Sequence, residues 1–146
     1  MDTFTWTSSQ EHVDWFALQE LYRIAPLEHK PADALQVVFT NSRFKCFVYE
    51  GTVLIGVGRA LADGVDCSYI CDVAIHPDYQ GIGLGKRIID ELKRLSQGHK
   101  KIILYANVGK EGFYQKMGFK KMNTAMAIFS NETQALESGL LSAIDI

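Results

Sequence analysis

The sequence contains few cysteines, few prolines and no long apolar run. Its 146 residues include three cysteines without a paired spacing, so no disulfide framework is predicted and a reducing, cytoplasmic compartment is the simplest interpretation. The longest apolar stretches have the length of strands, far below the ~20 residues that span a bilayer. The first residues also lack the basic and then apolar pattern of a signal peptide. We therefore expect a cytoplasmic protein with no membrane partner.

The sequence also has no excess of charge of one sign. Its formal net charge is −2, so it carries no overall basic field to attract nucleic acid, and we expect no nucleic-acid partner. Cys67 and Cys71 lie four residues apart in an expected strand, which places their side chains on one face. Because no second pair and no nearby histidine completes a tetrahedral set, inert thiols are favoured over a metal site.

The length fits a single domain, which we predict to span 1–146. No internal repeat and no linker rich in proline, glycine or serine interrupts it. Apolar periodicity and turn signals predict, in chain order, helices at 14–24 and 32–41, strands at 44–49, 53–61 and 67–75, a helix from 84 to about 97, a strand at 102–105, a helix at 109–117, strands at 119–122 and 125–129, and a helix at 132–141. This order is typical of an α+β protein with a mixed sheet.

The most informative stretch is the glycine-rich turn at 79–86, between an expected strand and an amphipathic helix. Its glycines permit positive φ and a close approach of a ligand to the backbone. Amide N–H groups at a helix N-terminus would converge on an anion such as a pyrophosphate, and Lys86 or Arg87 could add a charged contact. Arg87 stands where a P-loop requires Ser or Thr, and the glycines follow G-x-G-x-G rather than the dinucleotide pattern. A plain flexible turn is the alternative.

Two segments carry a resemblance to a known family. Residues 72–86, DVAIHPDYQGIGLGK, resemble the acetyl-CoA signature of the GNAT superfamily of N-acetyltransferases, and residues 113–119, FYQKMGF, resemble its second hallmark. The resemblance covers roughly 44–129. It implies a mixed, mainly antiparallel sheet flanked by helices, with a central strand, glycine-rich turn and helix that bind the cofactor. It also implies acetyl transfer from acetyl-CoA to a primary amine by direct attack in a ternary complex.

The resemblance further implies which residues bind acetyl-CoA, the acyl-donor substrate. The backbone of 73–75 would pair with the pantetheine arm as an added strand does, and the amides of 81–86 would hold the pyrophosphate. Asn107 stands seven residues before Tyr114, where related enzymes keep an asparagine that contacts the cofactor; a helix N-cap is the alternative. The expected binding residues are Val73, Ala74, Ile75, Gln80, Gly81, Ile82, Gly83, Leu84, Gly85, Lys86, Asn107, Gly112, Phe113 and Tyr114.

Two residues are candidates for proton transfer. Tyr114 is the expected general acid for the leaving thiolate, since a phenol with a pKa of ~10 is protonated at neutral pH; packing in the core is the alternative. Asp72 is the expected general base, acting through a water. Its alternative is a charged strand residue that faces solvent or pairs with a neighbour. Glu111 and His76 are further candidates for the base, although His76 in its turn is more readily structural.

The acceptor is expected to be a small amine, because the motif region resembles enzymes that acetylate free amines, including arylalkylamine (serotonin-type) acetyltransferases. Four acids could attract a cationic amine, or could be ordinary surface carboxylates: Glu28, Asp33, Asp63 and Asp66. A protein lysine or N-terminal amine is the alternative acceptor, and a non-catalytic acetyl-CoA-binding module is the alternative function. A C-terminal strand after Met122 could pair with a second copy and give a homodimer.

Overall fold

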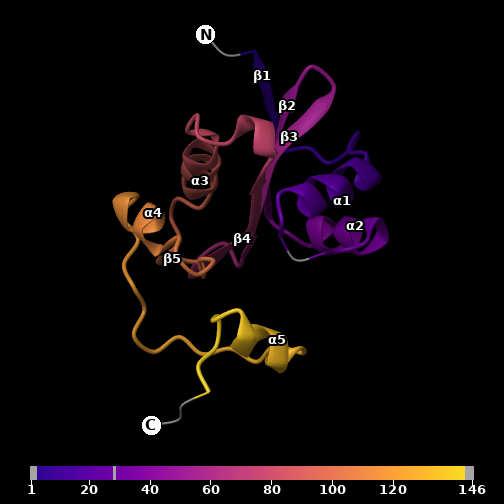
Figure 1. Cartoon of the computed structure of the whole chain (residues 1–146). Helices are drawn as coiled ribbons and strands as arrows, with labels where there is room; N and C mark the ends of the chain where they lie inside the picture. The colour runs from indigo at the N-terminus through magenta and orange to yellow at the C-terminus, as the bar shows by residue number, and fades with distance from the viewer. Residues whose placement is uncertain (1–2, 28, 144–146) are drawn as a thin grey trace. The chain divides into compact units, whose positions relative to one another are not determined.

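The structure, a computed structural model, describes residues 3–27 and 29–143 (Figure 1). The chain divides into two compact units, residues 1–104 and residues 105–146. Each unit is described separately below. None of the helices in the described part of the chain is both long and apolar enough to cross a membrane.

The first unit is built on a sheet with the strand order β1-β2-β3-β4-β5. Neighbouring strands from β1 to β4 are antiparallel, and β5 is parallel to β4. The elements, in chain order, are β1 (Phe4–Thr7), α1 (Trp15–Ile24), α2 (Ala32–Thr40), β2 (Phe44–Glu50), β3 (Val53–Ala62), β4 (Cys67–Ile75), the short 3-10 helix η1 (Pro77–Tyr79), α3 (Leu84–Leu95) and β5 (Lys101–Ile103). The predicted α+β class with a mixed, mainly antiparallel sheet flanked by helices is confirmed.

Helices cover both faces of this sheet, with α1 and α2 on one side and α3 on the other (Figure 1). The apolar stripe of α3 is fully buried. Its close approach to β3 depends on small residues, since a Cβ at Gly58 would lie 2.9 Å from side-chain atoms of both Ile88 and Leu92. The strand sequence therefore leaves room for the helix that carries the expected phosphate site.

The other face holds the main apolar cluster. Asp14 caps the start of α1 by accepting hydrogen bonds from the amides of Phe16 and Ala17, as expected for an aspartate N-cap. The buried members of the cluster come from α1, α2 and the central strands: Leu18, Leu21, Tyr22, Leu35, Phe39, Phe47, Leu54, Val57 and Ala74. Burying these side chains holds α1 against β3 and β4, which places the loop between α1 and α2 near the middle of β4.

The second unit contains α4 (Glu111–Lys116) and α5 (Glu132–Glu137). The predicted strands at 119–122 and 125–129 are wrong, because neither segment forms a strand. The segment 125–129 consists of apolar residues alone, but Met126 and Ile128 are almost fully exposed. A strand needs a neighbour for its backbone hydrogen bonds, and the described residues of this unit supply none.

The start of the chain holds the element that the periodicity missed. β1 has four residues and pairs with β2 from Phe4 opposite Glu50 to Thr7 opposite Phe47. An edge strand this short shows too few alternations to separate it from a loop. The other predicted elements are present with shifts of a few residues at their ends, as expected where helices fray.

Candidate active site

The N-terminus of α3 is open and polar. Gly81 and Gly83 have φ values of 82° and 83°, and a Cβ added at either position would meet no atom within 4 Å. Gly83 is the N-cap of α3, without a side-chain hydrogen bond to the helix, and the first turn contains no acidic residue. The first N–H groups of a helix have no partner within the helix, and the helix dipole favours an anion there. This turn therefore fits a phosphate group.

Contacts on both sides hold the turn in place. The amide of His76 donates to the carbonyl of Ile55 at 2.8 Å, and the side-chain amide of Gln80 donates to the carbonyl of Ile75 at 3.1 Å. Tyr79 donates its phenol to Glu50 at 2.5 Å, and this hydrogen bond raises the pKa of Tyr79. The turn is thereby tied to the hairpin of β2 and β3, so its amides keep a defined direction.

Two basic side chains follow the turn. The ammonium of Lys86 lies 2.7 Å from the carboxylate of Asp90, one helical turn further on. The guanidinium of Arg87 lies over the ring of Trp6 in β1, 4.8 Å from its centroid. Stacking of this kind is favourable for arginine on an indole. It links the beginning of α3 to a strand that the sequence did not reveal.

Strand β4 presents a free stretch of backbone beside the turn. The parallel ladder with β5 joins Cys67–Tyr69 to Lys101–Ile103, so the six residues 70–75 extend beyond it. On its other edge β4 pairs with β3 as far as Ile75, which lies opposite Gly56. The backbone of 73–75 can therefore accept an extended ligand arm as an added strand. Together, this edge and the amides of 81–86 fit the pantetheine arm and pyrophosphate of acetyl-CoA.

A bulge in β4 lies next to this free edge. Arg59 of β3 pairs with Cys71 of β4, and the next pair is Val57 with Ala74. Asp72 and Val73 therefore lie together opposite one residue of β3, Gly58. Asp72 has a φ of 56°, the one positive φ of a non-glycine residue in the described ranges. A backbone of this kind costs about 1–3 kcal/mol unless its surroundings stabilise it.

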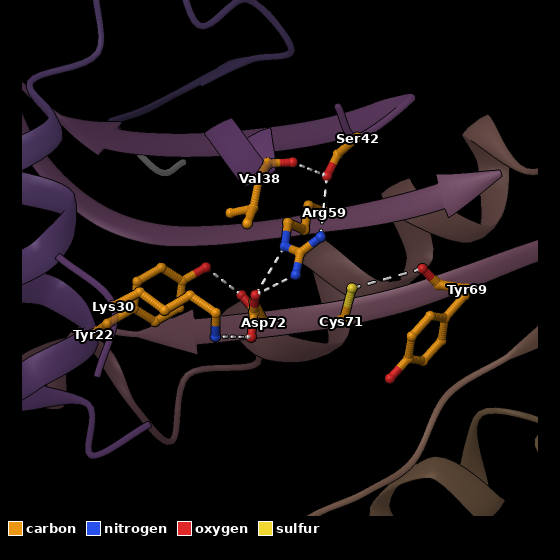
Figure 2. A network of polar contacts seen from close by, with 8 residues as sticks. All are labelled: Tyr22, Lys30, Val38, Ser42, Arg59, Tyr69, Cys71 and Asp72. Carbon is orange, nitrogen blue, oxygen red and sulfur yellow. Dashed lines mark hydrogen bonds and ion pairs between the residues drawn. The ribbon is translucent and has the colours of Figure 1, made fainter. Parts of the chain in front are cut away.

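Side chains from three other elements hold Asp72 (Figure 2). Arg59, buried beneath α2, donates from Nε to Oδ2 of Asp72 at 2.8 Å, and its Nη2 lies 2.7 Å from the same oxygen. Tyr22 of α1 donates its phenol to the backbone carbonyl of Asp72 at 2.6 Å. Nζ of Lys30, in the loop before α2, lies 3.5 Å from the other carboxylate oxygen, Oδ1.

This cluster is largely removed from water. Arg59 is 9% exposed, and its Nη1 donates to the hydroxyl of Ser42, which in turn donates to the carbonyl of Val38. Burial, and then the charge of Asp72, raise the pKa of Tyr22 well above its usual value. The side chains of Tyr22, Arg59 and Ser42 thus each have a hydrogen-bond partner, as buried polar groups require.

These contacts bear on the role expected for Asp72. Asp72 pairs with neighbouring charges, which was the alternative to a catalytic role. Each of its two carboxylate oxygens faces a cation. Its action as a general base stays a prediction. Arg59 did not appear among the expected site residues. The one available signal was a single arginine inside the apolar run of β3, which indicates a buried charged partner without naming it.

The remaining predicted site residues lie in the second unit. Helix α4 begins at Glu111 and its N-cap is Lys110, so the interpretation of Asn107 as a helix N-cap is wrong. The carbonyl of Asn107 instead accepts from the amide of Lys110 at 3.0 Å. Gly112 lies within α4 and carries no neighbouring atom within 4 Å of an added Cβ. Their roles in cofactor binding stay predictions.

Tyr114, also in α4, is packed between two aromatic rings. Its centroid lies 5.0 Å from that of Phe113 and 5.9 Å from that of Phe119, with the rings nearly perpendicular. Burial raises the pKa of Tyr114, so its phenol stays protonated at neutral pH. This state can donate a proton, as a general acid must.

The acids expected to attract an amine have local partners instead. The carboxylate of Asp63 accepts the amides of Val65, Asp66 and Cys67, and these hydrogen bonds lower its pKa to about 2. Asp66 pairs with Lys101 at 2.8 Å. Asp33 accepts the amide of the next residue, and Glu28 lies outside the described residues.

The three cysteines are free thiols. Burial raises the pKa of Cys46 to about 12 and that of Cys71 to about 11. Because the thiolate is the reactive form, these two side chains are unreactive at neutral pH. This agrees with the expectation that they serve packing.

Comparison with known proteins gives the same family as the fold and the turn. Residues 11–119 match the Acetyltransferase (GNAT) family. An uncharacterized N-acetyltransferase, ycf52-like, of Prochlorococcus marinus is 33% identical over 125 residues, covering 81% of this chain and 69% of that protein. The histone acetyltransferase TAP1 of Glycine max is 32% identical over 126 residues, covering 77% and 54%.

A solved structure supports the fold. An acetyltransferase of the GNAT family from Streptococcus pneumoniae superposes with a TM-score of 0.74 at 22% identity, covering 88% of this chain and 98% of that one. The chain thus has the architecture of this class of acyltransferase. It belongs to the GNAT acetyltransferase family, whose members use acetyl-CoA as the acyl donor, and it is an acetyl-CoA-dependent acyltransferase.

Proposed function

We propose that this chain transfers the acetyl group of acetyl-CoA to a primary amine by direct attack in a ternary complex, and that the acceptor is a small amine. The observation that carries the proposal is the open, uncapped start of α3 beside the free edge of β4. A diphosphate and an extended amide-bearing arm are the two groups that such a pair of features binds. When bound there, acetyl-CoA supplies a thioester.

The residues of the chain have separate tasks in this proposal. Backbone N–H groups of 73–75 hold the arm, and one of them donates to the thioester oxygen as negative charge develops on it. Asp72 accepts the proton that the amine must lose, through a water. Tyr114 donates a proton to the departing sulfur. The pairing of Asp72 with Arg59 and Lys30 supports a second task, which is to orient the amine.

A protein lysine is the second candidate acceptor. A relative that covers most of this chain carries the name histone acetyltransferase, and the acids expected to select a cationic small amine are held by local partners. A lysine side chain and a small alkylamine present the same primary ammonium. The difference lies in whether neighbouring peptide residues add affinity. The cytoplasmic location, the single domain and the homodimer stay predictions from the sequence.

A turnover screen tests the proposal. Thiol release from acetyl-CoA should be measured with polyamines, arylalkylamines, aminoglycosides and lysine peptides, beside calorimetric titration of acetyl-CoA. We expect binding, and release that depends on an added amine, with small amines ahead of peptides. Peptides ahead of small amines would establish the second candidate. Binding without release for any amine would leave a non-catalytic module, and no binding would refute the proposal.

Replacing Tyr114 tests the proposed general acid with a single substitution. Tyr114→Phe keeps the ring packed between Phe113 and Phe119 and removes only the hydroxyl. We expect kcat to fall by about 100-fold or more, the usual contribution of a general acid, with little change in acetyl-CoA affinity. Because burial raises the pKa of Tyr114, the wild-type rate should not decline through loss of this proton below pH ~10. Unchanged turnover in the variant would exclude the role.

A further inference from the structure

Lys30 brings a primary amine to the bulge of β4. It lies in the loop between α1 and α2, its side chain is 21% exposed, and Nζ lies 3.5 Å from Oδ1 of Asp72 (Figure 2). Asp72 is followed directly by 73–75, the backbone proposed to hold the arm that carries the thioester. An amine of the chain itself therefore lies beside both the expected proton acceptor and the expected position of the acetyl donor.

The charge of Asp72 does not depend on Lys30 alone for its partner. Arg59 already neutralises Asp72 through two contacts of 2.7 and 2.8 Å to Oδ2. Lys30 adds a second cation at the longer distance, on the other oxygen. Loss of that charge would leave the pair of Asp72 and Arg59 intact.

We propose that Lys30 is a site of self-acetylation. The inference rests on the proposed function, because it needs acetyl-CoA bound along β4. The ammonium of Lys30 loses a proton to Asp72, which passes it to water. The nitrogen lone pair then forms a C–N bond with the thioester carbonyl carbon while the C–S bond breaks. The electron pair leaves on sulfur, and the second proton that the nitrogen loses ends on this sulfur. The products are Nε-acetyl-Lys30, free coenzyme A and one released proton.

Position gives this lysine its advantage over the others. Lys100 and Lys120 are exposed, so acetyl-CoA in solution reaches them more readily than it reaches Lys30. Uncatalysed acylation should therefore favour these two exposed lysines. An amine already placed against the donor reacts instead at a high effective concentration, which is worth several orders of magnitude in rate when the geometry is right. Preferential acetylation of the less exposed lysine is thus the expected signature.

The test is a time course of the full chain with acetyl-CoA alone, read by peptide mass spectrometry, with calorimetric titration of acetyl-CoA in parallel. We expect Lys30 to be acetylated well before Lys100 and Lys120. The fraction modified at a given time should not change when the protein is diluted at saturating acetyl-CoA, because the reaction occurs within one chain. Slower modification on dilution would show transfer between chains and would overturn the proposal.

Two variants complete the test. Asp72→Asn tolerates the positive φ and removes the proton acceptor, so acetylation of Lys30 should slow by about 100-fold or more, while Lys100 and Lys120 react as before. Lys30→Arg should lose the modified peptide and still bind acetyl-CoA. If acetyl-CoA binds but Lys30 reacts no faster than the exposed lysines, self-acetylation is refuted and the proposed function stands. If acetyl-CoA does not bind, both fail.

Discussion

The turn before α3 and the bulge in β4 use the same left-handed backbone in different ways. At the turn, Gly81 and Gly83 adopt positive φ without steric cost, and a Cβ at either position would meet no atom within 4 Å. At the bulge, Asp72 adopts positive φ at a cost and is held by Arg59 and Tyr22 from neighbouring elements. The turn is open at Gly81 and Gly83, which carry no side chain. The bulge is stable because the side chains around it are fully paired.

The largest expected effect is a loss of stability when the bulge cluster is broken. Arg59→Ala leaves the carboxylate of Asp72 in a largely buried place with its closest partner removed. We expect the free energy of unfolding to fall by about 3–5 kcal/mol, as for other broken buried pairs. Urea unfolding measures this. Arg23→Ala breaks an exposed pair with Glu20 and should change stability far less, because solvent screens an exposed pair. Equal effects of the two variants would contradict a structural role for the bulge cluster.

The packing of α3 against β3 should show the next largest effect. Gly58 lies opposite the bulge, and Gly58→Ala would place a methyl group 2.9 Å from atoms of Ile88 and Leu92. We expect a loss of about 1–3 kcal/mol in stability, which is usual for an overpacked core. Gly112→Ala is the control, since its methyl group would meet no atom within 4 Å. That variant should be neutral or slightly stabilising in a helix.

The glycine turn is tested by measuring both acetyl-CoA binding and stability. Gly83→Ala forces an alanine into a left-handed conformation, which costs about 1–2 kcal/mol, and its methyl group would occupy the space beside the amides. Gly98→Ala is a matched control, because Gly98 also has positive φ and open surroundings but follows the other end of α3. Both variants should lose similar stability, and only Gly83→Ala should weaken acetyl-CoA binding. Equal binding by both would exclude the turn as the phosphate site.

The smallest expected effect concerns Asp63, whose carboxylate already occupies a cluster of amides. Three amide N–H groups lower its pKa from 3.8 to about 2. A lowered pKa means that the ionised form favours the folded state, so this contribution is complete above pH ~4 and is lost as the pH falls toward 2. The measurement is the free energy of unfolding of the wild type and of Asp63→Asn between pH ~4 and ~2. The difference between them should shrink at the acid end, and a constant difference would exclude the charge as its cause.

Much of the fold followed from local patterns. The stripe of Leu84, Ile88 and Leu92 predicted α3, the turn residues separated β2 from β3, and the glycines before α3 predicted a turn with positive φ. Local patterns failed for strands, because a strand forms only where a partner strand is present. β1 was missed because four residues carry too little periodicity. The strands expected at 119–122 and 125–129 did not form because apolar residues alone do not supply a partner strand.

The sequence by itself determined most of the elements from α1 to α4, the glycine turn and the family. These depend on residues close together in the chain, where glycine spacing and helical periodicity act directly on the backbone. Only the tertiary structure decided the role of the bulge, because Tyr22, Lys30, Arg59 and Asp72 meet only after α1 and β3 pack against β4. A charge in the sequence does not name its partner, since burial and distance decide which opposite charge it must face.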